Sequence, residues 1–465
     1  MGEVGIIGLG PMAENIVINV ESRGYSVSLY NRTYEKVESF LKEKCGSLRV
    51  RGYRELREFV DSLSPPRLVI LMVKAGKPVD DYVAELKKLL SRGDIVLDFG
   101  NSHFRDTERR YEELLREGIR FLGVGVSGGV EGALKGPSIM VGGDETGYAE
   151  VRELLRSIAA KYNDDSCEGY FGRGGAGHFV KIVHNGIEYA MLGGIAEVYQ
   201  FLRRVGGLSN GQIADCFSEW NGSELGSYLL EAASQVLRFR EEGSEVELVE
   251  KVVDEAEQKG TGMWASEEAM RLGVPAPSID AAVTERIAST SRGDRLALSK
   301  SFPRLTYERI GRLLAERLSE AALYGTYVMS YSQGLSMLVA AIESLGYQTE
   351  PRRALRVWRS GCIIRSKIVQ TAYESEESSS RYLFSTPIFT KGTLERVERW
   401  KEFIRLSASS GLPIPVISSA FNYFLMMTSE RLPTNLIQAI RDLFGAHGFR
   451  RSDREGEFHS TWRLT

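Results

Sequence analysis

From Val4 to about Phe171, short apolar runs alternate with amphipathic stretches in which apolar residues recur at a helical period. Six runs are rich in β-branched and aromatic residues and have the length of buried strands. They read VGIIGLG, YSVSLYN, PRLVILMVK, DIVLDFGNS, IRFLGVGVSGG and SIMVGGD. This alternation predicts an α/β fold in which a parallel sheet is connected by crossover helices.

The pattern changes at the glycine-rich sequence GRGGAG, residues 172–177. Beyond it the apolar residues follow a helical period up to about Arg441, and strand-like runs are rare. We therefore expect an α/β domain over residues 1–176, a large all-α domain over 177–440 and a C-terminal tail over 441–465. The tail is charged and weakly periodic, which is typical of a segment that is disordered or anchored on a neighbour.

Composition agrees with a soluble protein of more than one domain, because 465 residues exceed one ordinary core. No apolar run reaches the roughly 18 residues of a membrane span, so no membrane association is expected. The start has no pattern of an export signal and the four cysteines are scattered, which favours the cytoplasm. A formal net charge of −3 gives no reason to expect nucleic acid as a partner.

The first predicted strand leads into GLGPMA, a G-x-G-x-x-A fingerprint followed by a helical pattern through Val20. The first glycine allows a tight turn, the second lets backbone amides approach a pyrophosphate, and the alanine keeps the helix close to the sheet. The N-terminus of the helix also favours phosphate charge. A Rossmann-type dinucleotide-binding domain is therefore expected, with cofactor contacts from Gly8, Leu9, Gly10, Pro11, Met12 and Ala13.

The second predicted strand ends in Asn31, Arg32 and Thr33. An NAD-binding domain usually has an acidic residue there for the ribose 2′-hydroxyl, whereas Arg32 offers a cation to a 2′-phosphate. The sequence therefore favours NADP. The alternative is a solvated arginine in a turn, close to Glu35.

The most specific pattern is the helical sequence HFVKIVHNGIEYAMLGGIAEVYQFL, which begins at His178. Its polar residues recur at helical spacing and share one face, while the other faces are apolar. A helix that is apolar nearly all round is buried, so its polar face must line a site or be satisfied by partners. A structural ion pair between Lys181 and Glu188 is the alternative. The face consists of Lys181, His184, Asn185, Glu188 and Tyr189.

With these motifs the chain resembles the 6-phosphogluconate dehydrogenases of the β-hydroxyacid dehydrogenase superfamily. The matching segments are NRT at 31, MVKAG at 72, GNS at 100, SGG at 127, GPS at 136, KIVHNGIEY at 181, QKGTG at 258 and RDLFGAH at 441. The 3-hydroxyisobutyrate-type relatives are much shorter and lack the last two segments.

The resemblance implies oxidative decarboxylation of 6-phosphogluconate to ribulose 5-phosphate with NADP and without a metal ion. Lys181 would take the proton of the 3-hydroxyl while hydride leaves C3, and Glu188 would protonate the enediol left by carbon dioxide. Lys181 must lose its own proton first, and burial would lower its pKa.

The resemblance also assigns binding residues. For the carboxylate and hydroxyls of the substrate it implies Asn101, Ser127, Gly128, Gly129, His184 and Asn185. For the phosphate it implies Tyr189, Lys259, Arg286 and Arg441. For the cofactor it adds Val73, Lys74, Ala75 and, a second time, Asn101. Arg441 and His447 would come from the tail of a partner subunit, so an obligate homodimer is expected.

Two positions depart from the pattern of the family. Val130 stands where a second acidic residue is common, and Met263 stands where a lysine is common. The chain also ends soon after STW. These departures bear on affinity and on the extent of the tail. Another β-hydroxyacid dehydrogenase, or an NADP-binding sensor without turnover, remains an alternative.

Overall fold

The computed structural model describes residues 2–44, 49–258, 260–302, 306 and 309–462. Its N-terminal part is built on one eight-stranded sheet with the strand order β10-β7-β6-β5-β4-β1-β2-β3. The strands are β1 (Glu3–Ile7), β2 (Ser26–Tyr30), β3 (Val50–Tyr53), β4 (Leu68–Leu71), β5 (Ile95–Asp98), β6 (Arg120–Ser127), β7 (Ser138–Gly143) and β10 (Glu168–Tyr170). Around the sheet lie α1 (Pro11–Ser22), α2 (Tyr34–Lys44), α3 (Leu56–Asp61), α4 (Lys77–Leu86), α5 (Phe104–Arg116), α6 (Gly129–Lys135) and α7 (Glu145–Ile158).

The side chains of successive strand residues pack alternately into two separate apolar cores, one on each face of the sheet. Ile6 packs into a cluster with Ile16 and Val17 of α1, whereas its neighbour Ile7 packs into a cluster with Phe59 of α3 and Leu114 of α5. This period of two is the geometry of a strand that is buried on both faces. The predicted α/β Rossmann-type fold is thereby confirmed.

Residue register aligns the carboxyl ends of the central strands. Ile7 pairs with Tyr30 of β2 and with Leu71 of β4, and Leu71 pairs with Asp98 of β5. The chain builds β1, β2 and β3 in one direction and then returns to place β4 on the other side of β1. Such a reversal creates a crevice at the carboxyl ends of the strands, where ligands bind in this class of fold.

The prediction of an entirely parallel sheet was wrong at β7, which runs antiparallel to β6. The connection from Ser127 to Ser138 contains only the short helix α6, and parallel neighbours need a crossover of about a dozen residues or more. Strands β3 and β10 were not predicted. Both lie at edges of the sheet, and β3 (VRGY) is too polar and too short to stand out.

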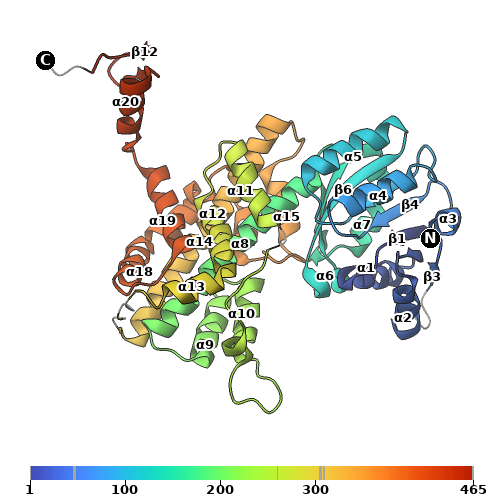
Figure 1. Ribbon diagram of the computed structural model, residues 1–465, viewed down its shortest axis with the longest axis horizontal. Coiled ribbons are helices and arrows are strands. Elements are labelled where there is room, and N and C mark those ends of the chain that lie inside the picture. Colours follow the sequence, from blue (N-terminus) through green and yellow to red (C-terminus); the bar gives the residue numbers. More distant parts are fainter. Residues whose placement is uncertain (1, 45–48, 259, 303–305, 307–308, 463–465) are drawn as a thin grey trace.

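The second part of the chain is helical, as predicted, and is organised around two long helices, α8 and α14, which pack on each other (Figure 1). Its helices are α8 (Ala176–Arg204), α9 (Asn210–Asn221), α10 (Tyr228–Arg238), α11 (Thr261–Arg271), α12 (Pro277–Thr290), α13 (Arg292–Leu298), α14 (Arg312–Leu345), α15 (Pro351–Trp358), α16 (Lys367–Glu374), α17 (Pro387–Leu394), α18 (Val397–Ser409), α19 (Pro415–Thr428) and α20 (Thr434–Gly445). Shorter elements are η1 (Leu248–Lys251), η2 (Leu383–Ser385), the pair β8 (Lys161–Tyr162) and β9 (Asp165–Ser166), and the pair β11 (Phe449–Arg450) and β12 (Glu457–Phe458). Across the described residues, no helix combines the length and the apolar character that crossing a membrane would require.

Glycines allow α8 to lie directly against β6 and β7. A Cβ atom on Gly142 would lie 2.3 Å from the backbone nitrogen of Gly177, and one on Gly125 would lie 2.5 Å from Cβ of Lys181. Both distances are far inside van der Waals contact. The absence of side chains at Gly125 and Gly142 therefore brings the first turns of α8, including Lys181, onto the sheet.

The end of the chain forms an arm that stands away from the helical body (Figure 1). We use the term arm for α20, β11, β12 and the loops between them, residues 434–462. Asp442 is fully buried and is the centre of the arm, since its carboxylate accepts hydrogen bonds from the backbone of Gly448 and Ser460 and from Nε1 of Trp462. The helical pattern was predicted to stop at about Arg441, but α20 continues to Gly445 because Asp442 fastens its last turn to the hairpin.

Candidate active site

The glycine fingerprint forms the turn between β1 and α1. Gly8 has a φ of +103°, and a Cβ atom there would lie 2.4 Å from the carbonyl oxygen of Met72, so only glycine fits. Gly10 is the N-cap of α1, and a Cβ atom there would meet nothing within 4 Å. Among the described residues, no side chain caps α1, which leaves the amides of its first turn without a capping partner. This is the cradle that a pyrophosphate requires, and a dinucleotide therefore fits these residues.

The other predicted cofactor residues follow the aligned strands. Asn31, Arg32 and Thr33 come directly after β2, and Nδ2 of Asn31 donates to the carbonyl oxygen of Thr33 at 2.9 Å. Arg32 is exposed, as is Glu35, and within the described chain no ion pair joins the two. The guanidinium of Arg32 is therefore available to an anionic ligand beside the crevice.

On the other side of β1, the segment Val73–Ala75 follows β4, and Asn101 follows β5. Lys74 and Asn101 are exposed at the same edge of the sheet. The register of β1, β2, β4 and β5 thus brings together all four segments that the sequence assigned to the cofactor.

The polar face predicted on α8 exists, and its side chains contact one another. Nζ of Lys181 lies 3.3 Å from Nδ1 of His184, which in turn lies 3.0 Å from Oδ1 of Asn185 and 3.9 Å from Oε2 of Glu188. Within the described chain, Lys181 and Glu188 form no ion pair within 4.0 Å. The alternative of a simple structural pair between Lys181 and Glu188 therefore does not describe this face.

Burial changes the protonation of this cluster. It lowers the pKa of the Lys181 ammonium to about 8, although the negative charge of Glu188 acts to raise it. Burial, followed by the positive charge of Lys181, holds the pKa of His184 well below its usual range. Burial also raises the pKa of the Glu188 carboxyl, against the opposing charges of Lys181 and Arg286. Near neutral pH, His184 is uncharged, and the Lys181 amine loses its proton far more easily than an ordinary lysine does.

Ser127 connects the sheet to this face. It is the last residue of β6, and its Oγ lies 2.9 Å from Nε2 of His184. Gly128 and Gly129 follow with φ values of +141° and +64°, and a Cβ atom on Gly128 would lie 2.4 Å from the carbonyl oxygen of Gly361. The Ser-Gly-Gly turn is therefore packed tightly between α8 and the chain at residue 361.

Tyr189 and Arg286 also meet. The guanidinium carbon of Arg286, on α12, lies 3.5 Å from the centroid of the Tyr189 ring. A Cβ atom on Gly262, the last residue of the QKGTG segment, would lie 2.3 Å from Cε2 of Tyr189, so Gly262 packs against the same ring. Lys259, predicted to bind phosphate, lies outside the described residues.

Helix α11, which begins within the QKGTG segment, is attached to the α/β domain. Nε and Nη2 of Arg105, on α5, donate to the two carboxylate oxygens of Glu268 at 3.1 and 2.7 Å. Glu268 is fully buried and also pairs with Arg271 at 2.8 Å. Nearby, the rings of His103 and Trp264 lie 5.0 Å apart. Asn101 is therefore close in the chain to residues that hold α11.

Two predicted residues do not join the site within this chain. Arg441 and His447 are exposed on the arm; Arg441 contacts Gln438 of its own helix, and His447 packs near Phe444. The departing residues Val130 and Met263 are both exposed, at 52% and 38%. Sequence reasoning missed Ile363, whose backbone nitrogen donates to Oγ of Ser127 at 3.3 Å, because a backbone contact from a distant loop has no motif.

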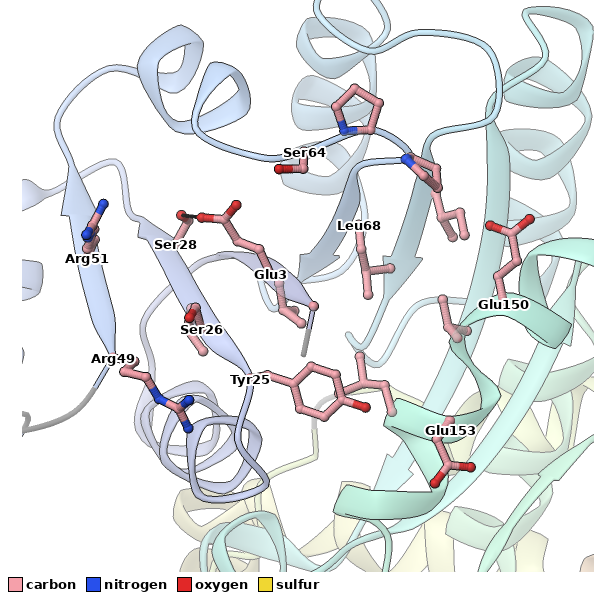
Figure 2. A pocket seen from close by; sticks show the side chains of 18 of the residues that line it. Glu3, Tyr25, Ser26, Ser28, Arg49, Arg51, Ser64, Leu68, Glu150 and Glu153 are labelled. Carbon is pink, nitrogen blue, oxygen red and sulfur yellow. Dashed lines mark hydrogen bonds between the residues drawn. The ribbon is translucent and has the colours of Figure 1, made fainter.

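A cavity of about 960 Å³ lies at the opposite edge of the sheet, by the amino ends of β1, β2 and β3 (Figure 2). Its lining includes Glu3, Ser26, Arg49 and Glu153. In this class of fold ligands bind at the carboxyl ends of the strands, so the size of this cavity does not make it the site of chemistry.

Two family models match the chain, one after the other. A family model for the NAD binding domain of 6-phosphogluconate dehydrogenase matches residues 3–172. A second model, for the 6-phosphogluconate dehydrogenase C-terminal domain, matches residues 177–462. The break between the two matches falls at the glycine-rich sequence that leads into α8.

Individual relatives are similar over their full length. The chain is 41% identical to the decarboxylating 6-phosphogluconate dehydrogenase of Synechococcus elongatus, covering 99% of each chain. It is 41% identical to the NADP(+)-dependent, decarboxylating enzyme of Bacillus subtilis, again covering 99% of each. The Plasmodium falciparum 6-phosphogluconate dehydrogenase, solved in its apo form and with NADP+ and 6-phosphogluconate, superposes with a TM-score of 0.94 at 35% identity over 99% of this chain and 100% of that one. The predicted resemblance is confirmed: this chain belongs to the 6-phosphogluconate dehydrogenase family.

Proposed function

We propose that the chain catalyses the NADP-dependent oxidative decarboxylation of 6-phospho-D-gluconate to D-ribulose 5-phosphate and carbon dioxide, without a metal ion. The observation that carries this proposal is the face of α8, where a buried lysine with a pKa of about 8 lies one helical turn from an imidazole and two turns from a carboxyl group of raised pKa. Membership of the family, whose Bacillus subtilis member is named NADP(+)-dependent and decarboxylating, supplies the substrate and the cofactor.

Neutral Lys181 is the general base in this proposal. Its Nζ accepts the proton of the substrate 3-hydroxyl, and the ammonium that forms keeps its hydrogen bond to Nδ1 of His184. When bound, NADP supplies the nicotinamide that accepts the hydride from C3. The product of this first step is a 3-keto acid, in which the new carbonyl is β to the carboxylate.

Two atoms must be protonated after this oxidation, the oxygen at C3 and the carbon that becomes C1 of the product. The bond between C1 and C2 breaks, carbon dioxide leaves, and its electron pair forms an enediol whose oxygen at C3 takes a proton from the Lys181 ammonium. Glu188, which its raised pKa keeps protonated more readily than an ordinary carboxyl, donates a proton to the carbon that becomes C1 of ribulose 5-phosphate. As the ketone forms, the neutral Lys181 amine takes the proton back from the hydroxyl at C3. The Lys181 base and the Glu188 acid therefore act from the same helix.

The binding residues in this proposal fall into three groups. Ser127, Gly128 and Gly129, with His184 and Asn185, hold the carboxylate and hydroxyls, and Asn101 contacts both ligands. Tyr189, Arg286 and Lys259 hold the phosphate, which is supported by the packing of Arg286 and the QKGTG segment on one ring. Gly8–Ala13 cradle the pyrophosphate, Arg32 binds the 2′-phosphate between Asn31 and Thr33, and Val73–Ala75 line the cofactor crevice.

We also propose a homodimer in which the arm of each subunit completes the site of the other with Arg441 and His447. Both residues are exposed on a projecting arm, distant in the fold from the α8 of their own chain. The arm also exposes large apolar side chains, since Leu436, Leu443 and Phe444 are 62%, 59% and 71% exposed. Apolar area of this kind is characteristic of a surface that another chain covers.

The cysteines bear on the compartment of the protein. Cys167, Cys216 and Cys362 are buried free thiols, which favours the reducing cytoplasm.

The test is an activity assay on the full-length protein. With 6-phosphogluconate and NADP we expect equal amounts of NADPH and carbon dioxide, and no effect of EDTA. A parallel assay with NAD measures the contribution of Arg32. If NADPH does not form, or forms without carbon dioxide, the proposed reaction is wrong; if EDTA abolishes it, metal independence is wrong.

A further inference from the structure

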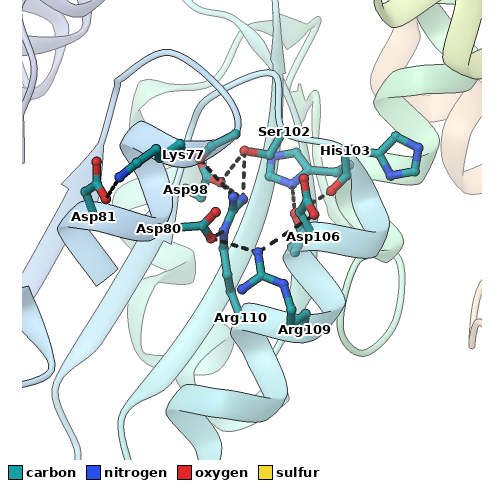
Figure 3. Close-up of polar contacts among 12 residues, drawn as sticks. Lys77, Asp80, Asp81, Asp98, Ser102, His103, Asp106, Arg109 and Arg110 are labelled. Atoms are coloured by element: carbon teal, nitrogen blue, oxygen red, sulfur yellow. Dashed lines mark hydrogen bonds and ion pairs between the residues drawn. The ribbon is translucent and has the colours of Figure 1, made fainter. Parts of the chain in front are cut away.

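Arg110 is a fully buried arginine that no step of the proposed reaction uses. It lies on α5, behind the carboxyl edge of the sheet, and its guanidinium reaches three other parts of the chain (Figure 3). Nη2 donates to the carbonyl oxygen of Gly76 at 3.1 Å, Nη1 donates to Oγ of Ser102 at 3.3 Å, and Nε donates to Oδ1 of Asp80 on α4 at 2.8 Å.

A second buried charge completes this cluster. Oδ2 of Asp98, the last residue of β5, lies 3.7 Å from Nη1 of Arg110 and accepts the hydroxyl of Ser102 at 2.6 Å. Oδ1 of Asp98 accepts the backbone N–H of Gly100 at 2.9 Å. Asp98 and Arg110 together therefore hold both residues that flank Asn101 in the chain.

The loops fixed in this way are the two that follow β4 and β5. Gly76 comes directly after Val73–Ala75, and Gly100 and Ser102 enclose Asn101. Arg110 thus ties one loop to the other across the edge of the sheet, through side chains that water does not reach. A buried charge is stable only when its partners are held in place, so such a network fixes the positions of the groups around it.

These loops lie on the side of β1 opposite to Arg32, which follows β2. In the proposed function, Arg32 binds the 2′-phosphate of the adenosine half and the fingerprint at β1 holds the pyrophosphate. Bound in this way, the nicotinamide half would extend over β4 and β5, toward β6 and Lys181. The distance between the nicotinamide and the substrate would then depend on the loops that Arg110 joins.

We propose that Arg110 is a positioning residue for hydride transfer, which holds the loops after β4 and β5 in the arrangement that places the nicotinamide against the substrate. The inference rests on the proposed function, because it needs the reaction to occur. Lysine cannot replace Arg110, since one ammonium group cannot reach Gly76, Ser102 and Asp80 in the planar fork that a guanidinium provides.

Asp80 permits a test that does not open the core, because it is 37% exposed on α4 and yet is a direct partner of Arg110. Its neighbour Asp81 is a matched control on the same helix; it is 58% exposed, and its one ion-pair partner among the described residues is Lys77, at 2.5 Å (Figure 3). Asp80→Ala and Asp81→Ala each remove one carboxylate from α4. Only the first removes an acceptor from Arg110.

The measurement is the primary isotope effect on kcat/KM with substrate deuterated at C3. For Asp80→Ala we expect kcat about tenfold lower and a larger isotope effect, because misplacement slows the hydride step. Affinity for adenosine 2′,5′-bisphosphate, the probe of the adenosine half, should be unchanged. Asp81→Ala should match wild type throughout. A purely structural role would reduce the amount of active enzyme but leave the isotope effect as it is, since that ratio does not depend on enzyme concentration.

Arg110→Lys is the second variant and should show the same larger isotope effect; if it does not fold, Asp80→Ala still decides the question. Equal isotope effects in wild type, Asp80→Ala and Asp81→Ala would overturn the inference. Failure of the proposed function would look different, because wild-type protein itself would then give no NADPH with 6-phosphogluconate.

Discussion

Lys181 lies with its ammonium nitrogen 3.3 Å from an imidazole whose own charge is suppressed by burial. Among the described residues, no negatively charged group is in direct contact with the lysine, and Glu188 acts only from further along the helix. Desolvation therefore outweighs attraction, and the proton is held weakly enough to be lost near neutral pH.

The pH dependence of kcat/KM should follow Lys181. Only the neutral amine accepts a proton, so activity is lost as the pH falls below its pKa of about 8 and reaches a plateau above it. We expect log kcat/KM for 6-phosphogluconate to rise with a slope of about one on the acid side. A profile that is flat from pH 6 to 8 would contradict the assignment of Lys181 as the base.

Replacing the base should abolish most turnover. We expect Lys181→Met to lower kcat roughly a thousandfold, since the methionine fills the space but accepts no proton. Lys135→Met is the control, because Lys135 is 73% exposed on α6 and, within the part of the chain that the structure describes, forms an ion pair with Glu131 alone. Steady-state rates and a melting curve for each variant separate lost chemistry from lost folding. A Lys181→Met enzyme with near-normal kcat would refute the mechanism.

At the scale of single residues, side chains that recur at helical spacing could be predicted from the sequence, whereas a buried charge without such spacing could not. The five polar residues of α8 were predictable because helical spacing alone puts them on one face. Arg110 was not, because an arginine in the amphipathic sequence FRDTERRYEELLR has the appearance of a solvated charge. Its burial depends on Asp80 and Asp98, which lie on other elements.

At the scale of elements, α5 and α11 form a bridge between the two domains. Arg105 and Glu268 make a two-pronged ion pair, and His103 packs on Trp264. The same segment of α5 leads back to Asn101, and α11 leads back to the QKGTG segment. The bridge therefore connects a loop proposed for the cofactor to a loop proposed for the substrate phosphate.

Breaking this bridge should weaken substrate binding. In Glu268→Ala the two arginine partners, which are 47% and 56% exposed, regain water, so we expect the protein to fold. The loop before α11 loses its anchor, and KM for 6-phosphogluconate should rise about fivefold while KM for NADP changes little. Glu267→Ala, one residue earlier and only partly buried, is the control. Identical KM values in the two variants would show that the bridge has no role in binding.

The elements themselves were predictable where a pattern was long. Six of the eight strands of the main sheet and the long helix α8 stand out by their apolar periods. The antiparallel direction of β7 could not be predicted from its pattern, because the direction depends on the short connection from β6 and not on the strand's own residues. The end of α20 was also missed, since it is set by the hydrogen bonds that Asp442 accepts from a later hairpin.

At the scale of the whole molecule, the arm carries apolar side chains that the described part of the chain leaves largely uncovered. It is folded around its own buried carboxylate, yet most of its apolar side chains are exposed. The proposed dimer accounts for both properties, because a folded arm can dock on a second chain with little loss of conformational entropy.

Two inactive variants should restore each other if the arm acts in the neighbouring site. Lys181→Met removes the proposed base from α8 and leaves the arm unchanged. Arg441→Ala removes the proposed contribution of the arm and leaves Lys181 unchanged. In randomly mixed dimers, half are mixed and each of these has one complete site, so we expect about one quarter of wild-type activity. The measurement is kcat after the two proteins are unfolded together and refolded, with each one refolded alone as control. No recovery would mean that each arm serves its own chain.

The projecting arm has a consequence for inheritance. If a site is assembled from the α8 helix of one chain and the arm of another, a helix and an arm encoded by different alleles can combine into one active site. Lesions near Lys181 and lesions near Arg441 would complement each other when carried on different alleles, and would fail to do so when carried on the same one.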